Sequence, residues 1–203
     1  MGVYLQGLTM GLAYVAPIGL QNLFVINSAL THTRRRALLT ALIVIFFDVT
    51  LALACFFGVG AVMERYAWLQ MAILLVGSLI VIYIGVGLLR AKVAELEQSR
   101  AESSIRKTIS SACVVTWFNP QAIIDGTMML GAFHATLSGS EGITFITGVA
   151  SASCLWFTGV TLLISIFSNR FDAKILRIIN VVCGAVIIFY GCKLLWSFVN
   201  MVM

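Results

Sequence analysis

The stretch "YVAPIGLQNLF", Tyr14 to Phe24, places a proline, a glycine and two side-chain amides inside the first apolar segment of the chain. A second stretch, "TWFNPQAIIDG" from Thr116 to Gly126, repeats the proline and adds a carboxylate. Pro17 and Pro120 are the only prolines in the 203 residues. Because proline cannot donate the backbone hydrogen bond of a helix interior, both stretches predict broken helices.

The composition assigns the chain to the membrane. Hydrophobic residues make up 61% and charged residues 10% of the sequence, whereas a soluble domain has about 25% charged residues. Apolar runs of helix length, rather than short alternating strands, predict an all-α polytopic bundle. A crossing takes about 20 apolar residues, and we expect six transmembrane helices, at Val3–Leu30, Ala37–Met63, Trp68–Leu89, Ile109–Phe133, Ile143–Phe167 and Ile175–Val199.

Basic residues indicate the orientation, because Lys and Arg collect in cytoplasmic loops. A chain with six spans and its N-terminus outside places most of its 13 basic residues in the cytoplasm, namely Arg34, Arg35, Arg36, Arg90, Lys92, Arg100, Arg106, Lys107, Arg170, Lys174 and Arg177. A five-span chain without the first crossing keeps the same loops in the cytoplasm, so charge alone leaves both topologies open. The polar linker of about residues 91–107 is expected on that side.

Weak internal repetition favours six spans. Asn22 and Asp125 each stand five residues after a proline, and the two prolines are 103 residues apart. Near the ends of the halves, "IGVGLLR" (Ile84–Arg90) matches "YGCKLLW" (Tyr190–Trp196) at a separation of 106 residues. Three spans per half make the second half enter the membrane from the opposite side. We therefore predict one transporter domain of two inverted three-helix repeats, about residues 1–90 and 108–203.

Polar side chains crowd both breaks and predict a binding site near the midplane. Broken backbone in lipid is tolerated where protein or a watery cavity satisfies it, and paired breaks in two halves point to a transporter's binding site. A plain packing kink is the alternative, but it does not need this side-chain polarity. We expect the helix breaks at Pro17, Gly19 and Pro120, and the substrate-binding side chains at Gln21, Asn22, Asn119, Gln121 and Trp156. For Trp156 the alternative to a cation–π contact is packing.

Two carboxylates lie deep inside predicted spans. Asp48 is 11 residues beyond Ala37, or about 16 Å into a core about 30 Å thick, and Asp125 lies similarly deep. An ionised aspartate there costs about 2.5 to 3.5 kcal/mol, so such residues face the bundle interior and bind ions, protons or charged substrates. We expect Asp48 and Asp125 to contact the substrate, Asp125 in first place because it adjoins the second break, and Asp48 or Asp125 to carry the coupling proton. Structural pairing with a hydroxyl or an amide is the alternative.

The sequence resembles the LysE family of amino-acid exporters over the whole chain, and most closely the branch that exports lysine and arginine. The resemblance rests on "PIGLQN" (Pro17–Asn22), "FFD" (Phe46–Asp48), "VTWFNPQAIID" (Val115–Asp125), "SASCLWF" (Ser151–Phe157) and "RIINVVCG" (Arg177–Gly184). It implies an exporter of basic amino acids in the bacterial cytoplasmic membrane. Neutral-substrate branches of that family keep an aspartate like Asp48 but not one like Asp125. One departure is Leu20, where the family's motif usually has a second proline.

Energetics favour proton antiport, because exporting a cation against an inside-negative potential costs about 2.3 kcal/mol per 100 mV. Exchange for one inward proton per substrate moves no net charge. The chain carries no Gly-rich phosphate loop, so we expect no ATP drive of its own. Neutral amino acids and divalent metal cations are the alternative substrates.

Other partners and activities are not indicated. Two intramembrane aspartates also occur in aspartyl proteases, but such proteases carry Tyr-Asp where this chain has Phe47 before Asp48, so we expect no enzyme. The five cysteines are scattered without a C-x-x-C pair, and we expect neither a metal nor another cofactor. The lipid bilayer is the expected surrounding, and no nucleic acid is expected. Gly7-x-x-x-Gly11 and the small residues Ala150–Cys154 permit close helix packing, within the subunit or in a homo-oligomer.

Overall fold

The computed structural model describes residues 2–58, 66–90, 104–134, 136–137, 139–167 and 173–202. The regular elements in these ranges are helices, so the all-α prediction is confirmed for this part of the chain. In order they are α1 (Val3–Val15), α2 (Leu20–Thr31), α3 (Arg34–Phe56), α5 (Ala67–Arg90), α7 (Ile105–Trp117), α8 (Pro120–Gly126), the π-helical turn η1 (Thr127–Gly131), α9 (Ala132–His134), α10 (Gly139–Phe167) and α11 (Ala173–Val202). Most of the predicted 91–107 linker lies outside the described residues.

Three described helices are long and apolar enough to cross a membrane. They are α3, α10 and the Val181–Met201 part of α11, and a fourth is added if α1 and α2 together form one bent span. Within α5, the apolar stretch Leu75–Gly87 is shorter than a full crossing. These elements identify a membrane helical protein, while the predicted number of six spans stays a prediction.

The first predicted span is divided at its proline. Helix α1 ends at Val15 and α2 begins at Leu20, and the two axes form an angle of 78°. Pro17 therefore lies in the connection, outside both helices, where its missing amide hydrogen breaks no helical hydrogen bond. The sharp bend places the N-terminal end of α2 inside the bundle.

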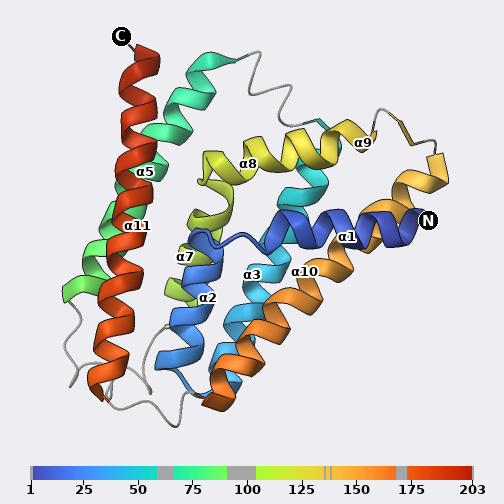
Figure 1. Cartoon of the computed structure of the whole chain (residues 1–203). Coiled ribbons are helices and arrows are strands. Elements are labelled where there is room, and N and C mark those ends of the chain that lie inside the picture. The colour runs from blue at the N-terminus through green and yellow to red at the C-terminus, as the bar shows by residue number, and fades with distance from the viewer. Residues whose placement is uncertain are drawn as a thin grey trace.

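The second proline acts in a different way. Helix α7 ends at Trp117, and Pro120 is the first residue of α8, a position that its fixed φ angle suits. The predicted span Ile109–Phe133 is therefore four consecutive elements, with α8, η1 and α9 continuing across the top of the view in Figure 1. Like the first break, this one places the N-terminus of a helix inside the bundle.

Helix pairing sets the arrangement of the bundle. Helix α5 packs along α11, α1 packs against α10, and α3 contacts both α7 and α10. Figure 1 shows that α2, α5 and α10 end, and α3, α7 and α11 begin, at the same end of the bundle. Nη2 of Arg36 donates a hydrogen bond of 3.1 Å to Oγ1 of Thr108 at this end. We call it the basic end, after Arg34, Arg35, Arg36, Arg90, Arg106 and Lys107.

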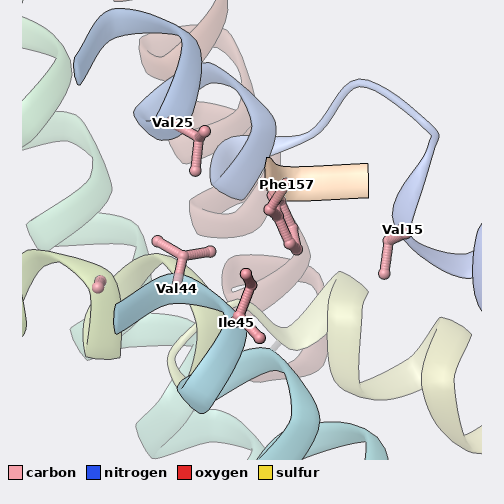
Figure 2. Packing of buried hydrophobic residues seen from close by; sticks show 6 residues of the cluster. Val15, Val25, Val44, Ile45 and Phe157 are labelled. Carbon is pink, nitrogen blue, oxygen red and sulfur yellow. The ribbon is translucent and has the colours of Figure 1, made fainter. Parts of the chain in front are cut away.

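One cluster of buried side chains lies where five helices meet. It joins α1, α2, α3, α7 and α10 through Val15, Val25, Val44, Ile45, Ala112 and Phe157. Figure 2 shows Val25, Val44, Ile45 and Phe157 turned toward one another, with Val15 to one side. Because this packing fixes the relative positions of five helices, it also fixes the polar groups that lie beside it.

Small residues let α1 approach α10 closely. A Cβ atom at Gly7 would overlap the carbonyl group of Phe145, and one at Gly11 would lie 2.8 Å from Cα of Val149. A Cβ atom at Gly148 would in turn overlap the carbonyl oxygen of Tyr4. The close packing indicated by the small residues is thus made within one chain.

Candidate functional site

Asp48 is a fully buried carboxyl group in α3, with an exposed fraction of 0%. Its Oδ1 accepts a hydrogen bond of 3.1 Å from Nε2 of Gln21, and its Oδ2 accepts one of 2.6 Å from Oγ of Ser153. The donors belong to α2 and α10, so three helices meet at this carboxyl group. Asp48 is therefore paired with a hydroxyl and an amide, as the structural alternative to a substrate contact predicts.

Both hydrogen-bond donors at Asp48 are neutral side chains. Among the described residues no Lys or Arg is paired with it. Hydrogen bonds stabilise a carboxylate, but a buried charge without a cation remains unfavourable. The arrangement therefore attracts a proton or a cationic ligand.

Gln21 connects Asp48 to the second broken segment. Its Nε2 also donates a hydrogen bond of 3.0 Å to Oγ1 of Thr116, a fully buried residue in the last turn of α7. Gln21 itself is in the first turn of α2, directly after the first break. The two breaks thus lie on either side of one side-chain amide, and both adjoin the buried carboxyl group.

Asn22 holds the first break together. Its Nδ2 donates hydrogen bonds of 2.8 Å to the carbonyl oxygens of Val15 and Pro17, two acceptors that the interrupted helix leaves free. Its Oδ1 accepts a 2.8 Å hydrogen bond from Nε1 of Trp156. Both expected substrate-binding residues, Asn22 and Trp156, therefore serve to fix the broken backbone in this structure.

Asp125 has different surroundings. It lies in α8 and is partly exposed, and its Oδ1 accepts a 2.7 Å hydrogen bond from Nε2 of Gln121, four residues earlier. Gln121 is exposed. Asn119 precedes α8 and is 9% exposed, but its side chain does not cap the helix. Among the described residues, the carboxyl group at the second break thus has a partner on its own helix only.

The two carboxyl groups lie at different depths in the bundle. Sγ of Cys55 donates a hydrogen bond of 3.6 Å to the carbonyl oxygen of Ile123, and a Cβ atom at Gly126 would lie 2.9 Å from the same sulfur. Cys55 follows Asp48 on α3 by seven residues, which is about 10 Å along a helix. Asp125, next to Gly126, is therefore about two turns farther from the basic end than Asp48.

The structure brings three residues to the site that sequence reasoning did not select. Ser153 and Thr116 lie within the quoted motifs, yet nothing in the sequence shows which hydroxyl faces a carboxyl group. Tyr14, the first residue of the opening stretch, is the third, since its ring packs beside the part of α3 that carries Asp48 and next to Gly126 of α8. Only the tertiary contacts reveal these roles.

The site offers carboxyl, amide and hydroxyl groups. Within the described ranges, no group of three or more His, Cys, Asp or Glu side chains is placed to hold a metal ion. The carboxyl, amide and hydroxyl oxygens of the site are groups that accept hydrogen bonds and can bind cations. Their chemistry fits recognition of a small charged molecule.

Comparisons with known proteins agree with this chemistry. The family of LysE type translocators matches residues 12–197. A protein named arginine exporter protein ArgO from Klebsiella pneumoniae (strain 342) is 35% identical over 196 residues, covering 94% of this chain and 92% of the relative. The protein of the same name from Escherichia coli (strain K12) is 33% identical, with the same coverage. No solved structure matches the chain.

Proposed function

The chain belongs to the LysE type translocator family, and on that basis we propose that it exports basic amino acids, arginine first and lysine second. Family membership and the exporters among its relatives identify it as an amino-acid transporter rather than an enzyme. The relatives at 35% identity are named for arginine. The observation that carries the choice of a cationic substrate is Asp48, a buried carboxyl group with neutral partners.

The substrate's positive charge replaces the cation that Asp48 lacks. Loss of hydration makes an isolated buried carboxylate unfavourable, and a bound guanidinium or ammonium group compensates its charge. Asp125, two turns away, supplies a second negative group nearer the other end of the bundle. Gln21 and Gln121 orient these carboxyl groups, while Asn22, Trp156 and the backbone at Pro17, Gly19, Asn119 and Pro120 keep the site open by maintaining the breaks.

Efflux measurements test the substrate assignment. Cells that overproduce the protein are loaded with labelled arginine, lysine or threonine, and the rate of efflux is compared with that of cells without it. The proposal predicts faster efflux of arginine and lysine and an unchanged rate for threonine. Threonine efflux without arginine or lysine efflux would support a neutral substrate instead, and a divalent-metal exporter would change none of the three rates.

Proton antiport is the proposed coupling. Asp48 or Asp125 binds either the substrate or a proton, and each displaces the other, so one proton enters as one cation leaves. In proteoliposomes with the membrane potential clamped, an imposed pH gradient should drive substrate counterflow. At least one of the two variants, Asp48→Asn and Asp125→Asn, should lose transport driven by the pH gradient. Unchanged pH-driven transport in both variants would remove the carboxyl groups as the coupling site.

The proposed architecture is one domain of six spans in the cytoplasmic membrane of a bacterium, with the basic end in the cytoplasm. The pairing of α3 with α10 and of α5 with α11 supports inverted repeats, because each pair joins corresponding predicted spans of the two halves. Cysteine labelling near residue 2 distinguishes the topologies. Labelling from outside the cell supports six spans, whereas labelling only from the cytoplasm supports five.

A further inference from the structure

The hydroxyl of Tyr14 is buried and has no hydrogen-bond partner among the described residues. A buried polar group without a partner is unfavourable and uncommon in proteins. The aromatic ring, by contrast, is well packed, since it contacts the Val15–Phe157 cluster and a second cluster of Ala52, Phe56, Leu130, Phe145 and Val149. The packing therefore holds the ring in place, while the hydroxyl is available for a hydrogen bond to a ligand.

The position of Tyr14 relates it to both carboxyl groups. The first cluster contains Val44 and Ile45, which precede Asp48 on α3, and the second contains Ala52 and Phe56, which follow it. Tyr14 contacts both clusters and so lies alongside this part of α3. Its ring also adjoins α8, because a Cβ atom at Gly126 would lie 3.3 Å from its Cε2 atom.

Tyr14 thus adjoins both elements that carry the acids. Asp48 lies on α3 between the residues of the two clusters, and Asp125 directly precedes Gly126 on α8.

We propose that Tyr14 is a further substrate contact, whose hydroxyl oxygen accepts a hydrogen bond from the transported cation between the two carboxyl groups. This inference rests on the proposed export of basic amino acids. A guanidinium group has five N–H donors, and both oxygens of Asp48 already accept hydrogen bonds from Gln21 and Ser153. The Tyr14 hydroxyl is a neutral acceptor, which satisfies a further donor of the cation without adding a charge.

Tyr14→Phe tests this role because it removes the hydroxyl and keeps the ring. We expect KM for arginine counterflow in proteoliposomes to rise about tenfold, as for a lost hydrogen bond to a charged group, with Vmax within about twofold of the original. Since the hydroxyl makes no internal hydrogen bond, the melting temperature of the variant should be equal or higher. Arginine should also raise that melting temperature less than it does in the unaltered protein.

Tyr4→Phe is the matched control, since Tyr4 is an exposed residue of the same helix, and its KM should not change. A KM for Tyr14→Phe within twofold of the original value would overturn the inference. A melting temperature well below the original would also overturn it, because it would show that the hydroxyl is bound within the protein. If the unaltered protein transports no arginine, the proposed function fails first, and this failure is seen before any variant is compared.

Discussion

Asp48 and Asp125 are the same type of residue in opposite surroundings. Asp48 is fully buried and accepts hydrogen bonds from two other helices, whereas Asp125 is partly exposed and accepts one from its own helix. The state of Asp48 is therefore set by tertiary structure, and that of Asp125 by its own helix. Under the proposed function, we expect the buried group to determine charge selectivity and the partly exposed one to assist capture or release.

The largest effect is expected for Asp48→Asn. The amide keeps the size of the side chain but removes the charge, so arginine transport should fall by at least about 100-fold, as for loss of one partner of a buried charge pair. The melting temperature should not fall, because an uncompensated charge is removed. Initial rates in proteoliposomes and a thermal melt in detergent measure the two effects. Retention of more than a tenth of the rate would contradict the assignment.

Asp125→Asn should have a smaller effect. Because Asp125 is less buried than Asp48 and has a partner on its own helix, we expect about a tenfold rise in KM and a measurable Vmax. Glu141→Gln, in the exposed first turn of α10, controls for the loss of a carboxylate elsewhere. If Asp125→Asn is as inactive as Asp48→Asn, the proposed difference in role between the two carboxyl groups is wrong.

Ser153→Ala tests whether tertiary hydrogen bonding supports Asp48. Removing the 2.6 Å donor should lower the transport rate about fivefold, since a hydrogen bond contributes about 1 kcal/mol net. Ser151→Ala is the control, because the Ser151 hydroxyl bonds only the carbonyl of Thr147 in its own helix. Equal rates in the two serine variants would show that the Ser153 contact is dispensable.

The smallest effect is expected for Gln121→Leu. The exposed Gln121–Asp125 pair is of the i, i+4 type, which contributes about 0.2 to 0.5 kcal/mol. We therefore expect a change in KM of about twofold or less. A tenfold change in KM would show that Asp125 depends on Gln121 as strongly as Asp48 depends on its hydrogen-bond donors.

Much of the fold could be predicted from the sequence. Hydrophobic run lengths identified α3, α10 and α11, because lipid requires every crossing to satisfy its own backbone. The prolines marked both breaks, since Pro17 and Pro120 each remove one backbone donor. The sequence could not show that Pro17 would lie between two helices while Pro120 begins one, because that choice depends on packing across the bundle.

The site was less predictable. Asp48 stood out because a charge in an apolar run is rare, and Gln121 was placed beside Asp125 by helical spacing. Asn22 was expected at the substrate. In the structure its amide bonds the carbonyls of Val15 at the end of α1 and of Pro17 in the connection, partners that no local pattern shows. Ser153 is 105 residues from Asp48, and such distant partners emerge only from tertiary structure.

The central claim is that the buried charge of Asp48 recognises a positive charge, and competition by citrulline tests it most directly. Citrulline has nearly the shape of arginine but a neutral ureido group in place of the guanidinium. In counterflow of labelled arginine, excess lysine should compete strongly and excess citrulline should compete at least about 100-fold less well, as for loss of a buried charge pair. Competition by citrulline equal to that by unlabelled arginine would contradict the claim.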